Sequence, residues 1–188
     1  PFHRGRRLRN NSWIRDLVTE NYVSVNDLIW PIFVCDGFKT KESIDSLPGI
    51  YRYSIDLVPE VANQAAELGI KCLAIFPKTP EKLKTMECEE AWNGENLVNR
   101  ATRAIKSEVP EIGIILDVAL DPYNAAGHDG LVRGTEILND ETLVALEKQA
   151  LVQCESGADI LGPSDMMDGR VRVIREALEK NNYNNKLI

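Results

Sequence analysis

Four continuous apolar runs, each about as long as a β-strand, constrain the fold of this chain more than any other feature. They span residues 28–34, 70–76, 112–118 and 158–161, and they start about 42 residues apart. Half-exposed antiparallel strands carry a polar residue at every second position, whereas the strands of a parallel sheet are apolar throughout. The four runs therefore predict buried parallel strands.

Helical patterns fill the intervals between these runs. One helix begins near Pro59, which suits a first helical position, and ends at Gly69. A later helix has Asn139 or Asp140 as its predicted cap, and the last one follows Asp168, a predicted N-cap. The apolar residues at helical spacing are Val61, Ala62, Ala65, Ala66 and Leu68; Leu97, Val98, Ala101, Ala104 and Ile105; Leu143, Val144, Leu146, Ala150, Leu151 and Cys154; and Val171, Ile174, Ala177 and Leu178.

Strand and helix units repeated in this way allow two architectures, because right-handed crossovers place the helices outside a parallel sheet. One is an open doubly wound sheet, and the other is part of a (β/α)8 barrel. No GxGxxG or GxxxxGK[ST] loop supports a nucleotide-binding sheet. Four units make about half of a barrel, since eight need roughly 250 residues. The run at 28–34 and a new apolar start near Ile188 would then be unpaired edges.

Composition and charge exclude several classes of function. The chain has 188 residues, of which 44% are hydrophobic, and a formal net charge of -7, which argues against general nucleic-acid binding. No apolar run approaches the roughly 18 residues that cross a bilayer, so we expect no membrane partner. The cysteines lack metal-ligand spacing, which predicts reduced packing residues and a cytoplasmic location. They are Cys35, Cys72, Cys88 and Cys154.

The N-terminal segment concentrates positive charge within this acidic chain. Its arginines are Arg4, Arg6, Arg7, Arg9 and Arg15, and they alternate with Phe2, Leu8, Trp13, Ile14 and Leu17. Three interpretations are open: a nucleic-acid tail, the remnant of a targeting peptide, or an arm that docks on another subunit. We favour the docking arm, because the aromatic and apolar residues are those that anchor protein interfaces.

Polar residues follow the predicted strands at the points where these end. The last part of the third strand delivers Asp117, and Pro163-Ser164-Asp165 follows the fourth. The carboxyl ends of parallel strands share one rim, where α/β folds carry their chemistry. We interpret Asp117 as a carboxylate that orients an ammonium group or moves a proton, with a strand-end cap as the alternative. Lys78 follows the second strand and is a Schiff-base candidate, although a solvated surface lysine is the more common outcome.

Asp117 opens a loop that also carries Asp121 and Asp129, with His128 beside the last of these. Oxygen ligands suit a hard cation, but Asp-Pro and Asp-Gly also mark an ordinary solvated turn. Further along, residues 165–170 can be read as a metal or phosphate turn, or as packing around a Met pair. Ser164 is the stronger site candidate in that segment.

Taken together, these segments resemble the delta-aminolevulinic acid dehydratase (porphobilinogen synthase) family. The residues that carry the resemblance are Arg6-Arg7-Leu8-Arg9, residues 28–34, Ser46-Leu47-Pro48-Gly49, Ala74-Ile75-Phe76-Pro77, residues 117–123, Gly127-His128-Asp129-Gly130, Leu138-Asn139-Asp140 and Pro163-Ser164-Asp165-Met166-Met167-Asp168-Gly169-Arg170. The resemblance implies a (β/α)8 TIM barrel with an extended N-terminal arm. Residues 1–24 would form the arm and first helix, and residues 25–188 the first half of the barrel.

The resemblance also implies a reaction and its residues. The family condenses two molecules of 5-aminolevulinate to porphobilinogen with loss of two waters, through two lysine Schiff bases, for tetrapyrrole and haem synthesis. Asp117 and Ser164 match catalytic-pocket residues, and Asp165 is expected in the substrate pocket. The family's lysines follow the Ser164–Arg170 motif, and neither of their motifs appears before Ile188. We therefore expect the 188-residue chain alone to be inactive.

Zinc-dependent members carry three cysteines where this chain has Ala119, Asp121 and Asp129. The resemblance is thus to the aspartate-rich, zinc-independent branch, with magnesium or a monovalent cation in place of zinc. Whether Asp121 and Asp129 bind the cation or only order the loop stays open. The family also implies a homo-oligomer, typically an octamer, assembled through the arm.

Two other functions remain as alternatives. One is a truncated, non-catalytic barrel that acts as a binding or assembly module. The other is a magnesium-dependent aldolase that holds its ion with Asp117, Asp121 and Asp129. The motif from Ser164 to Arg170 argues against the aldolase.

Overall fold

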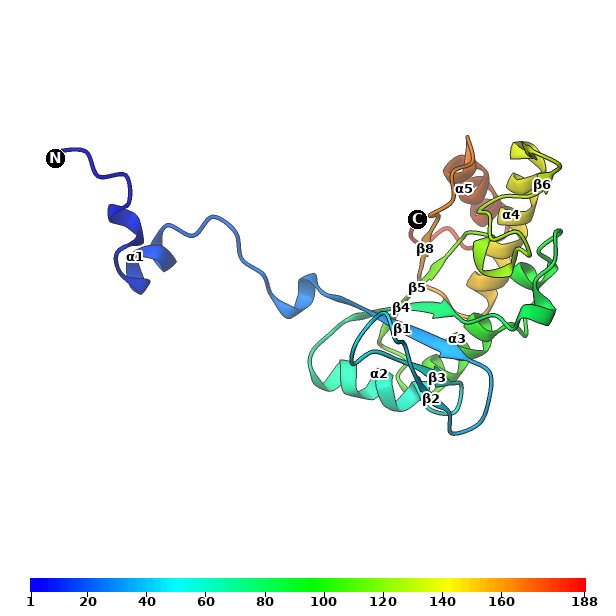
Figure 1. Ribbon diagram of the computed structural model, residues 1–188, viewed down its shortest axis with the longest axis horizontal. Helices are drawn as coiled ribbons and strands as arrows, with labels where there is room; N and C mark the ends of the chain where they lie inside the picture. Colours follow the sequence, from blue (N-terminus) through cyan, green and yellow to red (C-terminus); the bar gives the residue numbers. More distant parts are fainter.

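The computed structural model describes residues 1–188 and has a six-stranded, mostly parallel sheet at its centre (Figure 1). The strands are β1 Ile29–Cys35, β2 Lys41–Ser43, β3 Tyr51–Ser54, β4 Cys72–Pro77, β5 Gly113–Asp117 and β8 Ile160–Gly162. Their order is β2-β3-β1-β4-β5-β8, and only β2 runs antiparallel to its neighbour. All four predicted strands are therefore present, and their parallel direction is confirmed.

The two faces of the sheet differ in burial. On one face the side chains are almost fully buried, and they form the core with the helices: Ile32, Val34, Leu73, Ile75, Ile114, Leu116 and Leu161. On the other face, Phe33, Ala74, Phe76 and Ile115 are only partly buried. The apolar runs thus predicted the strands correctly, but within residues 1–188 the second face is left partly open. Phe33 and Phe76 contact each other there, with their ring centroids 5.8 Å apart.

Four longer helices accompany the strands, as the sequence predicts: three connect strands of the sheet, and the fourth follows β8. They are α2 Val58–Glu67, α3 Leu97–Glu108, α4 Asn139–Glu155 and α5 Arg170–Lys180. Pro59 occupies the first turn of α2, and Gly69 follows its end with a φ of +83°, a left-handed conformation that favours glycine. The side chain of Asn96 caps α3 by accepting a hydrogen bond from the backbone amide of Asn99 at 3.0 Å.

Two of the predicted helix caps are wrong. Helix α4 begins at Asn139 with Leu138 as its N-cap, and no side chain caps it. The Asn139 amide instead bonds the backbone of Asp168, whose N–H it accepts at 2.8 Å. Asp168 does not cap α5, because Gly169 in a left-handed conformation occupies that position. Tertiary contact between the start of α4 and the turn before α5 has replaced local capping at both places.

The strand β3 was missed because Tyr51-Arg52-Tyr53-Ser54 is short and carries a charged residue. It pairs in parallel with β1, so β1 lies inside the sheet and the prediction that residues 28–34 form an edge is wrong. At the other side, Leu187 continues the sheet beside β8. The amide of Leu161 donates to the Leu187 carbonyl at 2.9 Å, and that of Leu187 donates to the Asp159 carbonyl at 3.1 Å.

Short elements complete the chain. They are the 3-10 turns Arg7–Arg9, Val25–Asp27, Glu81–Leu83, Glu89–Trp92 and Asp121–Tyr123, the helix α1 Ser12–Leu17, and the hairpin strands β6 Val132–Arg133 and β7 Glu136–Ile137. No helix has the length and apolar character that a membrane crossing requires.

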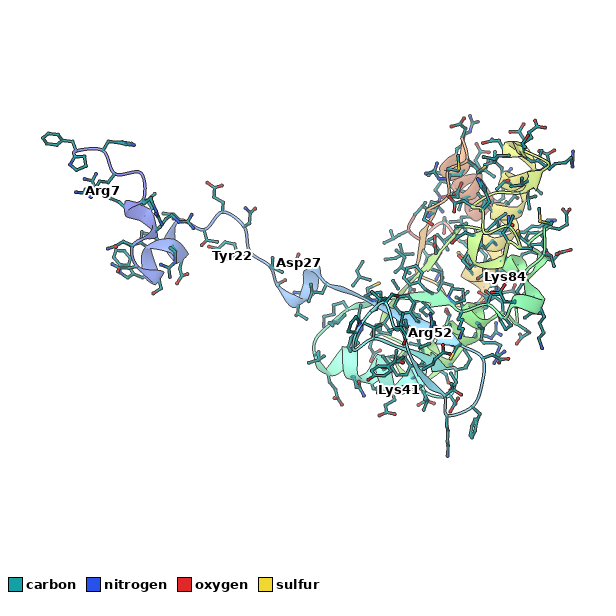
Figure 2. The ribbon with its side chains drawn as sticks, in the orientation of Figure 1. Arg7, Tyr22, Asp27, Lys41, Arg52 and Lys84 are labelled. Atoms are coloured by element: carbon teal, nitrogen blue, oxygen red, sulfur yellow. The ribbon has the colours of Figure 1, made fainter.

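Residues 1–24 extend away from the sheet, as Figure 1 shows, and none of them is buried. Figure 2 places Arg7 and Tyr22 along this extended segment, far from the side chains that pack around the strands. Trp13 and Leu17, both on α1, expose 64% and 76% of their surface. The segment therefore presents large apolar side chains to its surroundings, while the chain from β1 onward packs around the sheet.

Candidate active site

Asp117 and Ser164 form the centre of the candidate site. Asp117 is the last residue of β5 and Ser164 follows β8, and these strands are neighbours in the sheet. The Ser164 hydroxyl donates a hydrogen bond to Oδ1 of Asp117 at 2.6 Å. The structure thus brings together the two residues that the sequence singled out, at the carboxyl ends of parallel strands.

Burial raises the pKa of the Asp117 carboxyl group, because desolvation disfavours its charged form. The hydrogen bonds from Ser164 act in the opposite direction, and the negative charge of Asp129 adds to the rise. A carboxyl group with a raised pKa exchanges protons closer to neutral pH than an exposed one does. Asp117 is therefore suited to accept and return a proton, or to bind an ammonium group.

Two clefts meet at Asp117. The larger has a volume of about 890 Å³ and lies over the ends of β1, β4 and β5, with Asp121 and Lys78 also in its wall. The smaller, of about 170 Å³, lies on the partly open face of the sheet between Asp117 and Ser164. Its remaining lining is apolar or small and consists of Ala74, Phe76, Ile115, Leu116 and Gly162. A substrate at this point meets a polar pair beside an apolar wall.

Lys78 belongs to an ionic cluster on the wall of the larger cleft. Its ammonium group donates to both carboxylate oxygens of Glu42, at 2.7 and 2.9 Å, and Arg52 donates to the same carboxylate at 3.0 Å. The two cations hold the pKa of Glu42 below its usual range. The Lys78 side chain is 51% exposed and ion-paired, whereas a Schiff-base lysine needs a shielded amine. The geometry favours the interpretation of Lys78 as a surface cation.

Asp121 and Asp129 lie in the loop that follows β5, residues 118–130, which we call the aspartate loop. Desolvation raises the pKa of Asp121, and the negative charges of Asp117 and Asp129 raise it further. Asp121 is therefore close enough to both carboxylates to interact with them electrostatically. Asn124 orders the loop by donating to the Gly130 carbonyl at 3.0 Å. The loop is thus held by hydrogen bonds at its centre while its carboxylates repel one another.

The donor chemistry of this loop fits a hard cation, since it offers carboxylate oxygens and no thiol. These carboxylates do not form a complete set of metal ligands, because no three His, Cys, Asp or Glu side chains lie close enough together to hold a metal ion. Asp121 lines the larger cleft and Asp129 does not. Nδ1 of His128 accepts a hydrogen bond from the Gly130 amide at 3.0 Å, so this histidine contributes to the shape of the loop.

Asp165 lies away from both clefts. Only 3% of the Asp165 surface is exposed. Its Oδ1 accepts a hydrogen bond from the Met167 amide at 2.7 Å, and its Oδ2 lies 3.1 Å from Nε of Arg170. Met167 is itself buried in the core. This arrangement matches the packing interpretation of residues 165–170, in which Asp165 stabilises the turn behind Ser164.

Three polar residues of α4 escaped the sequence analysis because the predicted stripe of that helix was apolar. Val144 of that stripe is 53% exposed, whereas Thr142, Gln149 and Gln153 are buried. Gln149 donates to the Ala119 carbonyl at 3.0 Å and Gln153 to the Asp117 carbonyl at 2.7 Å. Their spacing of four residues on one helix face was the only available signal, and it is shared by many solvated helices.

Comparison with known proteins identifies relatives along the whole chain. The family model described as delta-aminolevulinic acid dehydratase matches residues 2–188. The delta-aminolevulinic acid dehydratase of Bradyrhizobium diazoefficiens is 52% identical over 177 residues, which cover 94% of this chain and 50% of that protein. That of Methanothermus sociabilis is 45% identical over 190 residues, with 100% and 58% coverage. The chain therefore spans about half the length of the curated relatives that it matches.

A solved structure supports the same relationship. The delta-aminolevulinic acid dehydratase (porphobilinogen synthase) of Toxoplasma gondii ME49, in complex with the reaction product porphobilinogen, superimposes with a TM-score of 0.94 at 42% identity. The match covers 97% of this chain and 52% of that one. The expected fold is thereby confirmed: an α/β chain that corresponds to about half of a TIM barrel.

Proposed function

The chain belongs to the delta-aminolevulinic acid dehydratase family, and from this premise we propose that the protein it forms part of is a porphobilinogen synthase. The reaction condenses two molecules of 5-aminolevulinate to porphobilinogen and releases two waters, as a step of tetrapyrrole and haem synthesis. The observation that carries the proposal is the Ser164 to Asp117 hydrogen bond of 2.6 Å, placed where the two clefts meet.

In this proposal Asp117 orients the ammonium group of a substrate molecule and exchanges its proton. The reaction needs a free amine to attack a carbonyl carbon, and 5-aminolevulinate carries an ammonium group at neutral pH. A half-buried carboxylate can hold that group and accept its proton. Ser164 fixes the direction of the carboxylate. Asp165 acts from behind, through the turn that carries Ser164.

We assign the two Schiff-base lysines to the part of the protein outside residues 1–188. Lys78 is the lysine of this chain that lies nearest in sequence to a strand end in the cleft, and its ion pair with Glu42 argues against a nucleophilic role. The apolar wall of the smaller cleft suits the carbon skeleton of the substrate. Residues 1–188 would then supply the proton-transfer pair and one wall of the pocket.

The test uses the full-length protein that contains this chain. Incubation with 5-aminolevulinate should yield porphobilinogen, and Asp117→Asn should lower kcat by about 100-fold or more, as expected for the loss of a proton-transfer group. Asp45→Asn is the matched control, since Asp45 is exposed and absent from the clefts. Borohydride should trap substrate on a lysine outside residues 1–188. Absence of product, or trapping on Lys78, would contradict the proposal.

The proposed cofactor is a hard cation, magnesium or a monovalent ion, and zinc is not expected. Asp121 and Asp129 would contribute to holding it, with water or other groups completing the coordination, since the chain gathers no set of three ligands. When bound, such an ion would supply positive charge beside the carboxylates of the loop. Desolvation is the main cause of the raised pKa of Asp121, and the ion's charge would offset the smaller rise that comes from Asp117 and Asp129.

The proposed assembly is a homo-octamer in which residues 1–24 dock on a second copy. The supporting observation is that Trp13 and Leu17 are largely exposed on a segment with no buried residue. We further propose a cytoplasmic location, because the four cysteines are unpaired and three of them are buried.

A further inference from the structure

We propose that Gln149 and Gln153 of α4 are positioning residues that act on Asp117 through its backbone. The inference rests on the proposed function and extends it to residues that do not line either cleft. The Gln153 amide donates to the Asp117 carbonyl at 2.7 Å, and the Gln149 amide donates to the Ala119 carbonyl at 3.0 Å and lies 3.5 Å from the Asp117 carbonyl.

These contacts fix the peptide at which the chain leaves β5. The carbonyl of Asp117 is held by α4, and the amide of the next residue, Val118, donates to the Gly162 carbonyl of β8 at 3.2 Å. The peptide between Asp117 and Val118 is therefore held from both sides, by a helix and by a strand. With the Ser164 bond to its side chain, Asp117 is restrained at its carboxylate and at its backbone.

Burial makes these hydrogen bonds necessary. Val118, Ala119 and Leu120 are between 0% and 1% exposed, so water cannot reach the carbonyl groups at this point. The neighbouring strands do not supply hydrogen-bond donors to these carbonyl groups either, because β5 ends at Asp117. An amide side chain from the facing helix is the available donor, and the two glutamines lie four residues apart on that face.

The glutamines also carry a cost that argues for more than packing. Gln149 and Gln153 are 0% and 1% exposed, and the Oε1 atom of each is buried without a hydrogen-bond partner. A buried unpaired acceptor destabilises the fold. Such a cost is typical of residues that are retained for a functional geometry. Thr142 of the same helix accepts from the Leu131 amide at 2.9 Å, so α4 anchors both ends of the aspartate loop.

The experiment compares three variants of the full-length protein. Gln149→Met and Gln153→Met remove the N–H donors and keep a side chain of similar length. Leu146→Val is the matched control, because Leu146 is fully buried on the same helix and its apolar side chain makes no hydrogen bond. We expect Gln153→Met to lower kcat by about tenfold or more with little change in KM, since a small displacement of a reacting group has an effect of that size. The control should stay within about twofold.

A double-mutant cycle separates positioning from a general loss of stability. In an Asp117→Asn background, Gln153→Met should lower kcat by less than about twofold, because the residue through which it acts has already been disabled. An equal tenfold loss in both backgrounds, or a similar loss in Leu146→Val, would overturn the inference.

A second readout does not depend on catalysis. Hydrogen exchange of the backbone amides in residues 118–129 should be faster in Gln153→Met than in Leu146→Val. If the wild-type protein fails to make porphobilinogen, the proposed function is wrong, and hydrogen exchange still decides the positioning role. Equal exchange in the two variants would overturn that role.

Discussion

The Ser164 hydroxyl donates to Oδ1 of Asp117 at 2.6 Å, although the two residues are 47 positions apart in the sequence. The pairing depends on the neighbouring strands β5 and β8, in which Asp117 lies opposite Gly162. It joins a hydroxyl donor to a carboxyl group whose pKa is raised by burial.

Ser164→Ala should raise the pKa of Asp117 further, because the bonds from Ser164 lower it in the wild-type protein. The acid limb of the pH profile of kcat/KM should then move to higher pH, and activity below that limb should fall by about tenfold. The measurement is the pH dependence of porphobilinogen formation by the full-length protein. An acid limb at the wild-type pH would show that Ser164 does not influence the carboxyl group.

Asp117→Asn should stabilise the folded protein at neutral pH while it abolishes most of the activity. Burial raises the pKa of Asp117 above the ordinary value of 3.8, so the folded state binds a proton more tightly than the unfolded state does. Stability contributed by this group is therefore lost as the pH rises from 3.8 through the folded-state pKa. Removing the charge should raise the free energy of unfolding at pH 7 by on the order of 1 kcal/mol.

Denaturant unfolding at two pH values checks this prediction. The difference between Asp117→Asn and wild type should disappear near pH 3, where the carboxyl group is protonated in both states. A variant that is less stable than wild type at pH 7 would contradict the assignment of a desolvated carboxylate.

Gly162→Ala should narrow the smaller cleft. A Cβ atom at this position would lie 3.3 Å from Cδ1 of Ile115, so the isoleucine must move by a few tenths of an ångström. Both residues line the cleft beside Asp117. We expect kcat/KM to fall by roughly three- to tenfold, with a change of less than about 1 kcal/mol in the free energy of unfolding. An unchanged kcat/KM would place the substrate elsewhere.

A chelator should lower the activity of the full-length protein, and magnesium rather than zinc should restore it. The aspartate loop offers oxygen donors, which suit a hard ion. Asp129→Asn should weaken the response to magnesium by about fivefold or more, since a carboxylate binds the ion more strongly than an amide does. Calorimetric titration with magnesium gives a readout besides activity. Restoration by zinc alone would contradict the proposal.

Deleting residues 1–9 from the full-length protein should reduce its oligomeric state. That segment holds several of the arginines and two exposed apolar residues, Phe2 and Leu8. Without these contacts the docking surface of the arm becomes smaller. A sizing column coupled to light scattering measures the mass. An oligomer of unchanged size would exclude these residues as assembly contacts.

The sequence alone was sufficient for the parallel strands β1, β4, β5 and β8 and for the longer helices. These signals are local. The apolar residues of a strand determine that it is buried, and the residues next to a helix end determine where the helix stops. The positions of Asp117 and Ser164 at strand ends followed from the same pattern. Their shared rim is a general property of parallel sheets.

Only the tertiary structure decided which polar groups meet. The caps of α4 and α5 were mispredicted because Asn139 bonds the backbone of Asp168, 29 residues away, in place of its own helix. The strand β3 was missed because its pairing with β1 outweighs its weak local signal. The two buried glutamines of α4 lie outside the apolar stripe that the sequence predicts for that helix. Their burial depends on the loop after β5, whose carbonyls need donors that no neighbouring residue in the sequence provides.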